Sequence, residues 1–341
     1  MWVVLVCFTS ASRQLHVCQR HRKDEGVFGP PARYKEVGAG QTVVIVDTGF
    51  EKHESEHYRS SPYASQVEEV ALWPGREQRV PSHACKSYTI GYAHYAPRAK
   101  VVMLRFFESI YINAENQAIS FLRGMRLSLE WIIANALVRN ITTVQISALD
   151  GYADMQVYEQ SPGGLEELWL FDNAINRLRR DFPQIWISAP TGNGERNTGN
   201  QSHDARYPGP GKLISWPARH PLIFAIGCAI FKNGQPMAVF QRTSQTQLSM
   251  ATWPTSTCNT FACAFSLHIR DAMGVSQLSA HQVFEAMKLG SITFFDNESQ
   301  SNQTIAMPMK AKDCIHGRRV DIRCSTQRSA SLSAGVAATA S

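Results

Sequence analysis

Three short polar segments directly follow apolar runs of the chain, and each offers groups that can do chemistry. They are Asp47-Thr48-Gly49, Ser147-Ala148-Leu149 and Gly192-Asn193-Gly194. The Asp47 carboxylate ends an apolar run, where burying its charge is costly unless a partner compensates it. The Asn193 amide can donate hydrogen bonds, and its flanking glycines allow a tight backbone turn, although an ordinary loop would use the same residue types.

The apolar runs before these segments alternate with amphipathic helical patterns. Strands are expected at 42–46, 100–107, 142–147, 184–189 and 222–228, and helices at 117–139, 165–180, 261–273 and 279–288. The last helix opens with a capping box formed by Ser279 and Gln282. Strands that alternate with helices favour an α/β fold with a mostly parallel central sheet and helices on both faces. Functional residues of such sheets lie at the carboxyl ends of strands, where all three polar segments are placed.

The composition excludes several classes of function. The 341 residues are 44% hydrophobic and 18% charged, with a net charge of +6 that is spread along the chain. Because no run of Lys and Arg with interleaved aromatic residues stands out, we expect no nucleic-acid partner. No apolar run approaches the roughly 20 residues of a membrane-spanning helix, so we expect no membrane contact. No G-x-G-x-x-G follows the first strand, and no cofactor is expected.

Metal binding and export also find little support. The acidic segment 51–69 lacks the D-x-D-x-D-G spacing of a calcium loop, so no metal is expected. The eight cysteines form no C-x-x-C pair; we expect mostly free, partly buried thiols, with Cys314 and Cys324 as the first candidates for a disulfide. The apolar stretch from Trp2 to Phe8 lacks the basic region of a signal peptide, which favours an intracellular location.

Six segments, taken in order, resemble the subtilisin-like serine proteases. Residues 38–49 are similar to the family's strand that ends in a catalytic D-T-G, and residues 91–100 are similar to its G-x-A-P-x-A-K. Residues 128–147 resemble the helix and strand before its substrate-binding backbone, and residues 187–194 resemble its A-A-G-N segment. Residues 216–228 resemble its Y-P-A and V-I-A-V-G-A, and residues 260–262 stand in the place of its G-T-S-x-A. The resemblance implies a three-layer subtilisin-like peptidase domain at 38–290. Residues 1–37 would be an N-terminal extension, and 291–341 a C-terminal extension with a disordered tail.

The resemblance also implies an endopeptidase that hydrolyses peptide bonds by a Ser/His/Asp-type mechanism. In the implied roles Asp47 orients the general base His83, Asn193 stabilises the oxyanion, and Thr260 stands at the nucleophile position. The segment Ser147, Ala148 and Leu149, together with Gly192, would bind the substrate. The implied partner is a peptide or protein substrate, and we expect a monomer.

The nucleophile segment departs from the family's pattern. The methyl group of Thr260 restricts its χ1 angle, and known threonine nucleophiles commonly use their own N-terminal amine as base. Thr260 would alternatively cap the helix at 261–273. Ser256 lies four residues earlier, outside the expected helix, so its use would need a register shift. Cys258 and Cys263 offer thiols, but neither occupies the aligned position.

The base and the activity stay open for a related reason. His83 is followed by Ala84 and Cys85, where the family has H-G-T, and the rival histidines are His94, His53 and His57. An active endopeptidase is one interpretation. The alternative is a catalytically inactive subtilase that binds peptides or regulates, accepting an extended peptide by strand addition. An unrelated α/β hydrolase is disfavoured, since no G-x-S-x-G is present.

Overall fold

A computed structural model describes residues 35–47, 67–72, 91–105, 114–147, 159, 162–192, 214–239, 241–251, 255–274 and 278–307, with the backbone alone at 114–120, 255 and 256. Four of the predicted site residues, His83, Ala148, Leu149 and Asn193, lie outside the described residues. The proposed cysteine pair at 314 and 324 and the histidines at 53 and 57 also lie outside them.

The strands of the described residues form a single ten-stranded sheet. Its order is β2 (Val67–Ala71), β3 (Lys100–Arg105), β1 (Thr42–Asp47), β4 (Ile141–Ile146), β5 (Trp186–Pro190), β6 (Phe224–Lys232), β8 (Leu248–Met250), β10 (Ser301–Ile305) and β9 (Ile292–Asp296), with β7 (Gln235–Val239) beside β6. All pairs from β2 to β8 along this order are parallel, whereas β7 and β9 pair antiparallel with β6 and β10. Every residue of β1 and β4 is buried, as a parallel strand covered on both faces requires.

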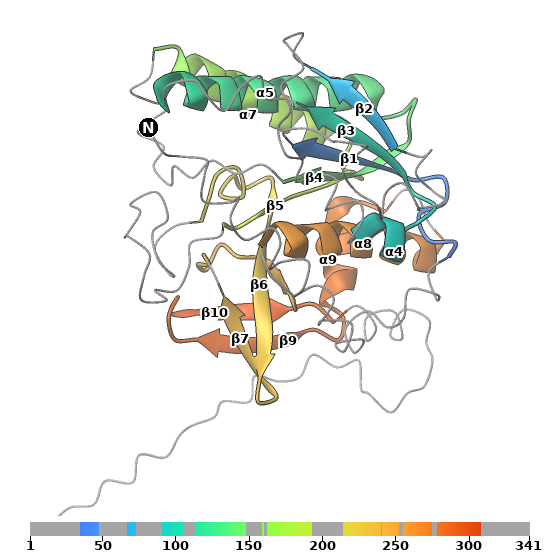
Figure 1. The fold of residues 1–341 in the computed structure, drawn as a ribbon, viewed down its shortest axis with the longest axis vertical. Helices are drawn as coiled ribbons and strands as arrows, with labels where there is room; N and C mark the ends of the chain where they lie inside the picture. Colours follow the sequence, from blue (N-terminus) through green and yellow to red (C-terminus); the bar gives the residue numbers. More distant parts are fainter. Residues whose placement is uncertain are drawn as a thin grey trace, which may run out of the picture.

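Helices cover both faces of the sheet, as Figure 1 shows. On one face lie α5 (Ala114–Asn135) and α7 (Gly164–Asp181), and on the other lie α4 (Ala93–Tyr95), α8 (Thr255–Met273) and α9 (Ala280–Lys288). Because side chains alternate along a strand, Val43 and Ile45 of β1 join the core under α8, while Val44 and Val46 join the core under α5. The expected α/β architecture is confirmed.

Several elements differ from the sequence-based expectation. Helix α8 begins at Thr255 rather than at residue 261. Glu68 and Glu69, which the sequence assigned to an acidic loop, lie in strand β2, where Glu68 pairs with Arg139. The hairpin of β9 and β10 lies beyond residue 290 and joins the same sheet through β8. The capping box of α9 forms as predicted between Ser279 and Gln282.

A buried ion pair holds the hairpin of β9 and β10 to the segment that follows β7. Arg242 donates to both carboxylate oxygens of Asp296, at 2.7 and 3.0 Å, and to Glu298 at 2.6 Å. Asp296 also accepts from the backbone N–H and the hydroxyl of Ser299. Burial raises the pKa of Asp296, but the bonds from Arg242 and Ser299 outweigh it and hold that pKa below its ordinary value.

Replacing Arg242 with methionine should lower the free energy of unfolding by about 3–5 kcal/mol, because Asp296 would keep a buried charge without its main partner. The double variant Arg242→Met/Asp296→Leu should recover part of the loss. Urea unfolding followed by tryptophan fluorescence measures both. A cost below about 1 kcal/mol for Arg242→Met would show that the pair does not hold the hairpin.

The same pair predicts an acid-sensitive component of stability. The folded pKa of Asp296 lies below the unfolded value of about 3.9, so the pair stabilises the fold above that value and stops doing so as the pH falls through the folded pKa. The wild type should therefore lose stability below about pH 4 more steeply than Asp296→Asn. Urea unfolding across a pH series tests this, and equal slopes for the two proteins would contradict it.

Candidate active site

The sheet changes its direction of growth between β1 and β4. From β1 the chain continues to β2 and β3 on one side, and from β4 it continues to β5 and β6 on the other. The intervening α5 and α7 pack on one face, and α4 packs on the opposite face. In open α/β sheets, ligands bind outside the carboxyl ends of the strands at such a switch point. We therefore expect a ligand site at the residues that end β1 and follow β4.

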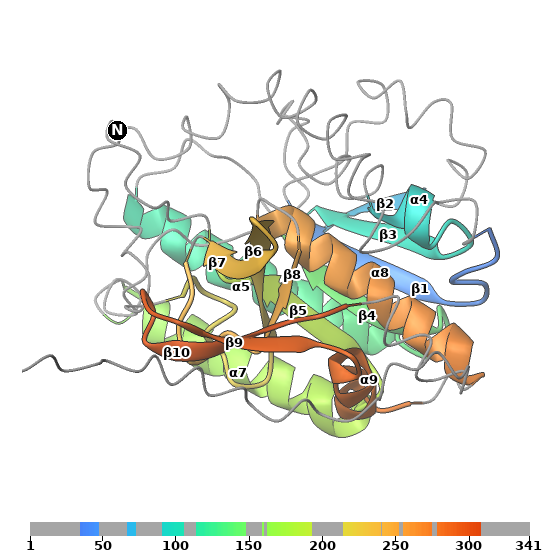
Figure 2. The ribbon, with the colours of Figure 1, turned by 90° about the horizontal axis from the view of Figure 1, so that it is seen from below.

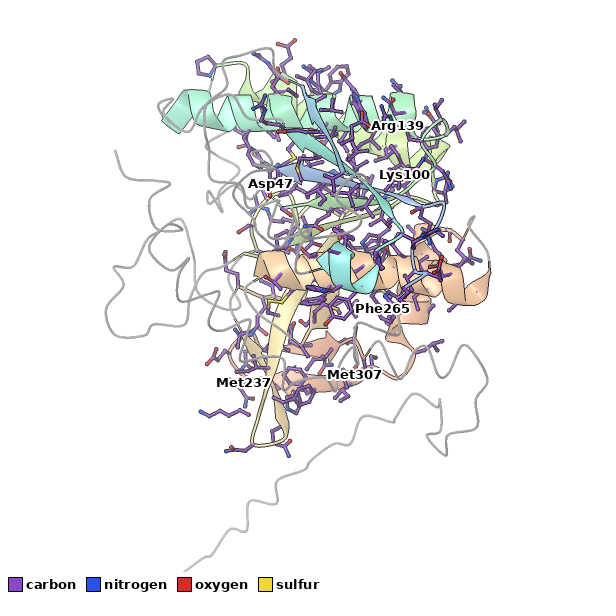
Figure 3. All side chains as sticks on the ribbon, turned by 45° about the vertical axis from the view of Figure 1, so that its right-hand side comes forward. Asp47, Lys100, Arg139, Met237, Phe265 and Met307 are labelled. Carbon is purple, nitrogen blue, oxygen red and sulfur yellow. A yellow bond between two sulfur atoms is a disulfide. The ribbon has the colours of Figure 1, made fainter. Side chains whose placement is uncertain are left out.

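Asp47 and Ser147 lie side by side at this point. Asp47 is the last residue of β1 and is 3% exposed. The backbone N–H of Ser147 donates to the carbonyl of Val46 at 3.0 Å, which brings the ends of β1 and β4 together. Figure 3 shows Asp47 at the edge of the sheet opposite Lys100, which begins β3. A carboxylate buried here requires a donor, the role predicted for His83.

Gly192 extends the same edge beyond β5. Its φ of +122° and its packing both require glycine, since a Cβ would lie 2.0 Å from Oε1 of Gln241 and 2.4 Å from Oγ of Ser215. The Ser215 N–H donates to the carbonyl of Thr191 at 2.8 Å. The backbone immediately before Asn193 is thus held tightly, which suits a residue whose side chain must point in one direction.

Helix α8 runs antiparallel to the central strands, so its first turn reaches their carboxyl edge. Near its start, Asn259 donates to the carbonyl of Ile146 at the end of β4, at 2.8 Å. Near its end, the Asp271 carboxylate accepts from the N–H of Gly38 and from the side chain of Gln41, just before β1. Figure 2 shows α8 crossing in front of β1, β4 and β5.

Buried polar side chains fix the register of α8 on β4 and β5. Ser188 of β5 donates to Oδ1 of Asn259 at 2.7 Å and accepts from the Trp186 indole at 2.9 Å. Further along α8, the hydroxyl of Ser266 lies 2.8 Å from the hydroxyl of Thr143 in β4. These bonds have fixed partners, so they determine the level of residues 259–266 of α8 relative to the strands.

Thr260, the predicted nucleophile, is part of this buried layer. It lies well inside α8, is 1% exposed, and its Oγ1 accepts from Nε2 of Gln145 at 3.0 Å. Oε1 of Gln145 accepts from the Tyr92 hydroxyl at 2.6 Å, and Nε2 also donates to Ser147. The Thr260 methyl packs where a side chain on Gly91 would clash. The alternative role as a helix cap is wrong, because α8 begins five residues earlier.

Ser256 lies in the first turn of α8, not outside the helix as expected. Residues four apart share a helix face and are separated by about 6 Å along the axis. Thr260 is level with Gln145, and α8 runs antiparallel to β4. The backbone of Ser256 is therefore one turn nearer the carboxyl edge, at the level where Asp47 and Ser147 lie.

A sequence signal for this register was present. Thr255-Ser256 repeats the Thr-Ser pair of the family's G-T-S-x-A, with Cys258 at the position of the alanine. Both residues lie at the start of α8. Apolar helical spacing begins only at Phe261, so the spacing alone predicts a later start for this helix.

The cysteines near this helix do not provide a nucleophile. Cys258 forms a disulfide with Cys228 of β6, a pair that the sequence did not indicate. Cys263 is a buried free thiol, and burial raises its pKa to about 12, so it is protonated near neutral pH. The other cysteines lie outside the described residues.

The described residues contain no group of three or more His, Cys, Asp or Glu side chains that could hold a metal ion.

No helix in the described part of the chain is long and apolar enough to cross a membrane. His94, one rival for the general base, is exposed on α4.

No protein-family model matches the chain, and no curated protein sequence does. Solved structures match most of it. A protease from Pseudoalteromonas arctica is similar over 88% of this chain and 97% of its own, with 12% identity and a TM-score of 0.55. The nisin leader peptidase NisP from Lactococcus lactis is similar over 83% and 89%, with 13% identity and a TM-score of 0.51. A cold-adapted subtilisin-like serine proteinase is similar over 80% and 90%, with 12% identity and a TM-score of 0.50.

At these identities the similarity concerns the fold. The three proteins are matched over at least 89% of their own lengths, so the likeness extends to the whole domain rather than to a single βαβ unit. The mostly parallel sheet and the helices packed against it are parts of this shared architecture. The chain has the fold of the subtilisin-like serine proteases.

Proposed function

We propose that this protein is a serine-type endopeptidase of the subtilisin-like class and that Ser256 is its nucleophile. The observation that carries the proposal is the convergence of Asp47, Ser147 and the first turn of α8 at one edge of the sheet. The similar solved structures are a protease, a leader peptidase and a serine proteinase, which makes peptide-bond hydrolysis the reaction that best fits this fold.

In the proposed mechanism, the Ser256 hydroxyl attacks the carbonyl carbon of the scissile bond. His83 accepts the hydroxyl proton and later donates it to the leaving amine, while Asp47 orients His83 and stabilises its charged form. Asn193 donates to the developing oxyanion. The first backbone N–H groups of a helix have no partner within it, so the first turn of α8 offers a further donor at the same place.

The substrate is proposed to bind as an extended strand along the carboxyl edge. Ser147, Ala148 and Leu149 follow β4 in the sequence, and Gly192 lies two residues beyond the end of the neighbouring β5. Strand addition uses main-chain hydrogen bonds and so accepts peptides of varied sequence. Gly192 has a positive φ, and neighbouring atoms occupy the space that a Cβ would need. Both features keep that part of the backbone in one conformation.

Thr260 fits this proposal as a positioning residue. Its hydroxyl accepts from Gln145, so it would have to give up a buried hydrogen bond before it could attack a substrate. It also lies one turn below the carboxyl edge. Ser256 has a primary hydroxyl without the methyl group that restricts the χ1 angle of threonine.

A peptide-binding protein without catalytic activity is the second candidate. The sequence His83-Ala84-Cys85 favours it, because the family has glycine and threonine after the histidine and uses the small glycine to pack that segment closely. The two candidates share the fold and the substrate strand. They differ in whether Ser256 and His83 react.

Hydrolysis of a mixed fluorogenic peptide library separates the candidates. Ser256→Ala should reduce kcat by at least about 10⁴-fold, because the attacking hydroxyl is removed. Thr260→Val, which keeps the shape of the side chain, should stay within about tenfold of wild type, since a positioning contact contributes far less than the nucleophile. Activity in Ser256→Ala combined with silence in Thr260→Val would make Thr260 the nucleophile. A folded but silent wild type would favour the peptide-binding protein.

The positioning role of Thr260 predicts a stability effect that is independent of activity. Thr260→Val should cost about 1–2 kcal/mol of unfolding free energy, because the Gln145 amide loses an acceptor in a buried site. A double-mutant cycle with Gln145→Leu, measured by urea unfolding, should give a coupling energy of about 1 kcal/mol. Coupling near zero would mean that this hydrogen bond does not hold α8 on β4.

A further inference from the structure

The disulfide between Cys228 and Cys258 joins two parts of the proposed active site. Strands β5 and β6 pair in parallel with Pro190 opposite Ile226; Cys228 lies two residues further along β6, and Gly192 lies two residues beyond the end of β5. Cys258 lies two residues after Ser256 in α8. The Cα atoms of the two cysteines are 5.8 Å apart, and both side chains are fully buried.

The start of α8 depends on this link more than the rest of the helix does. The first N–H groups of a helix lack intrahelical partners, so a first turn needs outside contacts to keep one position. The contacts of Asn259 and Thr260 with the sheet begin one turn below Ser256. Among the described contacts between α8 and the sheet, the disulfide is the nearest to Ser256 in the sequence.

We propose that the Cys228–Cys258 disulfide is a positioning element that fixes Ser256 against the Gly192 segment, so that full catalysis requires the oxidised protein. This inference rests on the proposed function. A displacement of reacting groups by about 1 Å can reduce the rate on the order of 100-fold. The peptide is proposed to bind beside the ends of β4 and β5, which the disulfide does not link. Breaking the disulfide should therefore lower kcat and leave KM near its wild-type value.

Reduction also gives the proposal a defined chemical step. Two thiol groups of dithiothreitol supply two electrons and two protons to the disulfide. The S–S bond breaks, Cys228 and Cys258 become thiols, and the reductant closes into its own disulfide. Because both sulfurs are buried, reduction of the folded protein should be slow, and activity should decline in step with the appearance of the two thiols.

The test compares Cys228→Ala/Cys258→Ala with a control variant on the opposite face of the sheet. Glu167→Gln weakens a partly buried cluster in which Glu167 of α7 accepts from Arg123 and Arg126 of α5. That variant should also lose stability, but it leaves α8 untouched. Both are assayed on the peptide library at a temperature where circular dichroism shows them folded.

The proposal predicts a kcat loss of about 100-fold with nearly unchanged KM in the cysteine variant, and kcat near wild type in Glu167→Gln. Hydrogen exchange should be faster at residues 257–262 in the cysteine variant alone. If Cys228→Ala/Cys258→Ala fails to fold, Cys228→Val/Cys258→Ala refills the lost volume, and the reduced wild type provides the same comparison.

Three results would overturn the proposal. They are alkylation of Cys228 and Cys258 in the native, unreduced protein, wild-type kcat in a folded cysteine variant, and unchanged hydrogen exchange at the start of α8. A wild type that is folded, disulfide-bonded and inactive would instead contradict the proposed function. In that case the exchange measurement alone decides whether the disulfide fixes the first turn.

Discussion

The buried hydrogen bonds between α8 and the two strands beneath it are the interaction on which the site depends. A helix packed on a sheet only by apolar side chains can shift along it at moderate cost, because such contacts are not directional. Asn259, Thr260 and Ser266 instead have specific partners on β4 and β5. A shift of one turn would leave several buried polar groups without partners, at about 1–3 kcal/mol each. The position of Ser256 follows from this register.

The same constraint explains how distant segments form one site. The parallel sheet brings the carboxyl ends of β1, β4 and β5 to one edge, where Asp47, Ser147 and Gly192 lie. Helix α8, which is antiparallel to these strands on one face of the sheet, begins at that edge. The disulfide links the start of this helix to β6. Strand order, helix direction and a covalent link therefore act together, and none of them alone would bring the groups of the proposed site together.

The sequence predicted the central elements because their patterns are dominated by burial. The continuous apolar run at 42–46 and the capping box at Ser279 correspond directly to β1 and α9. It did not predict the start of α8, since the segment 255–260 is mostly polar, and Asn259 and Thr260 bury their polar groups in hydrogen bonds to the sheet. A pattern that only separates polar from apolar residues assigns such a polar run to a loop. With α8 beginning at Thr255, we propose the nucleophile four residues earlier, at Ser256 instead of Thr260.

Other features could not be derived from the chain itself. Cysteine spacing does not identify a pairing among eight candidates, and Cys228 and Cys258 become neighbours only once α8 packs against β6. The hairpin of β9 and β10 depends on the buried pair of Arg242 and Asp296, which are far apart in the sequence. The roles of His83 and Asn193 stay predictions that rest on the resemblance and on the positions of Asp47 and Gly192.

Covalent labelling of the nucleophile tests the central claim most directly. A fluorophosphonate reacts with an activated serine hydroxyl, forming an oxygen–phosphorus bond and releasing fluoride. Treatment of the folded, disulfide-bonded protein, followed by proteolysis and tandem mass spectrometry, identifies the residue that carries the phosphonate. The account predicts the adduct on Ser256 and none on Thr260. An adduct on Thr260, or no adduct on a protein shown to be folded, would contradict it.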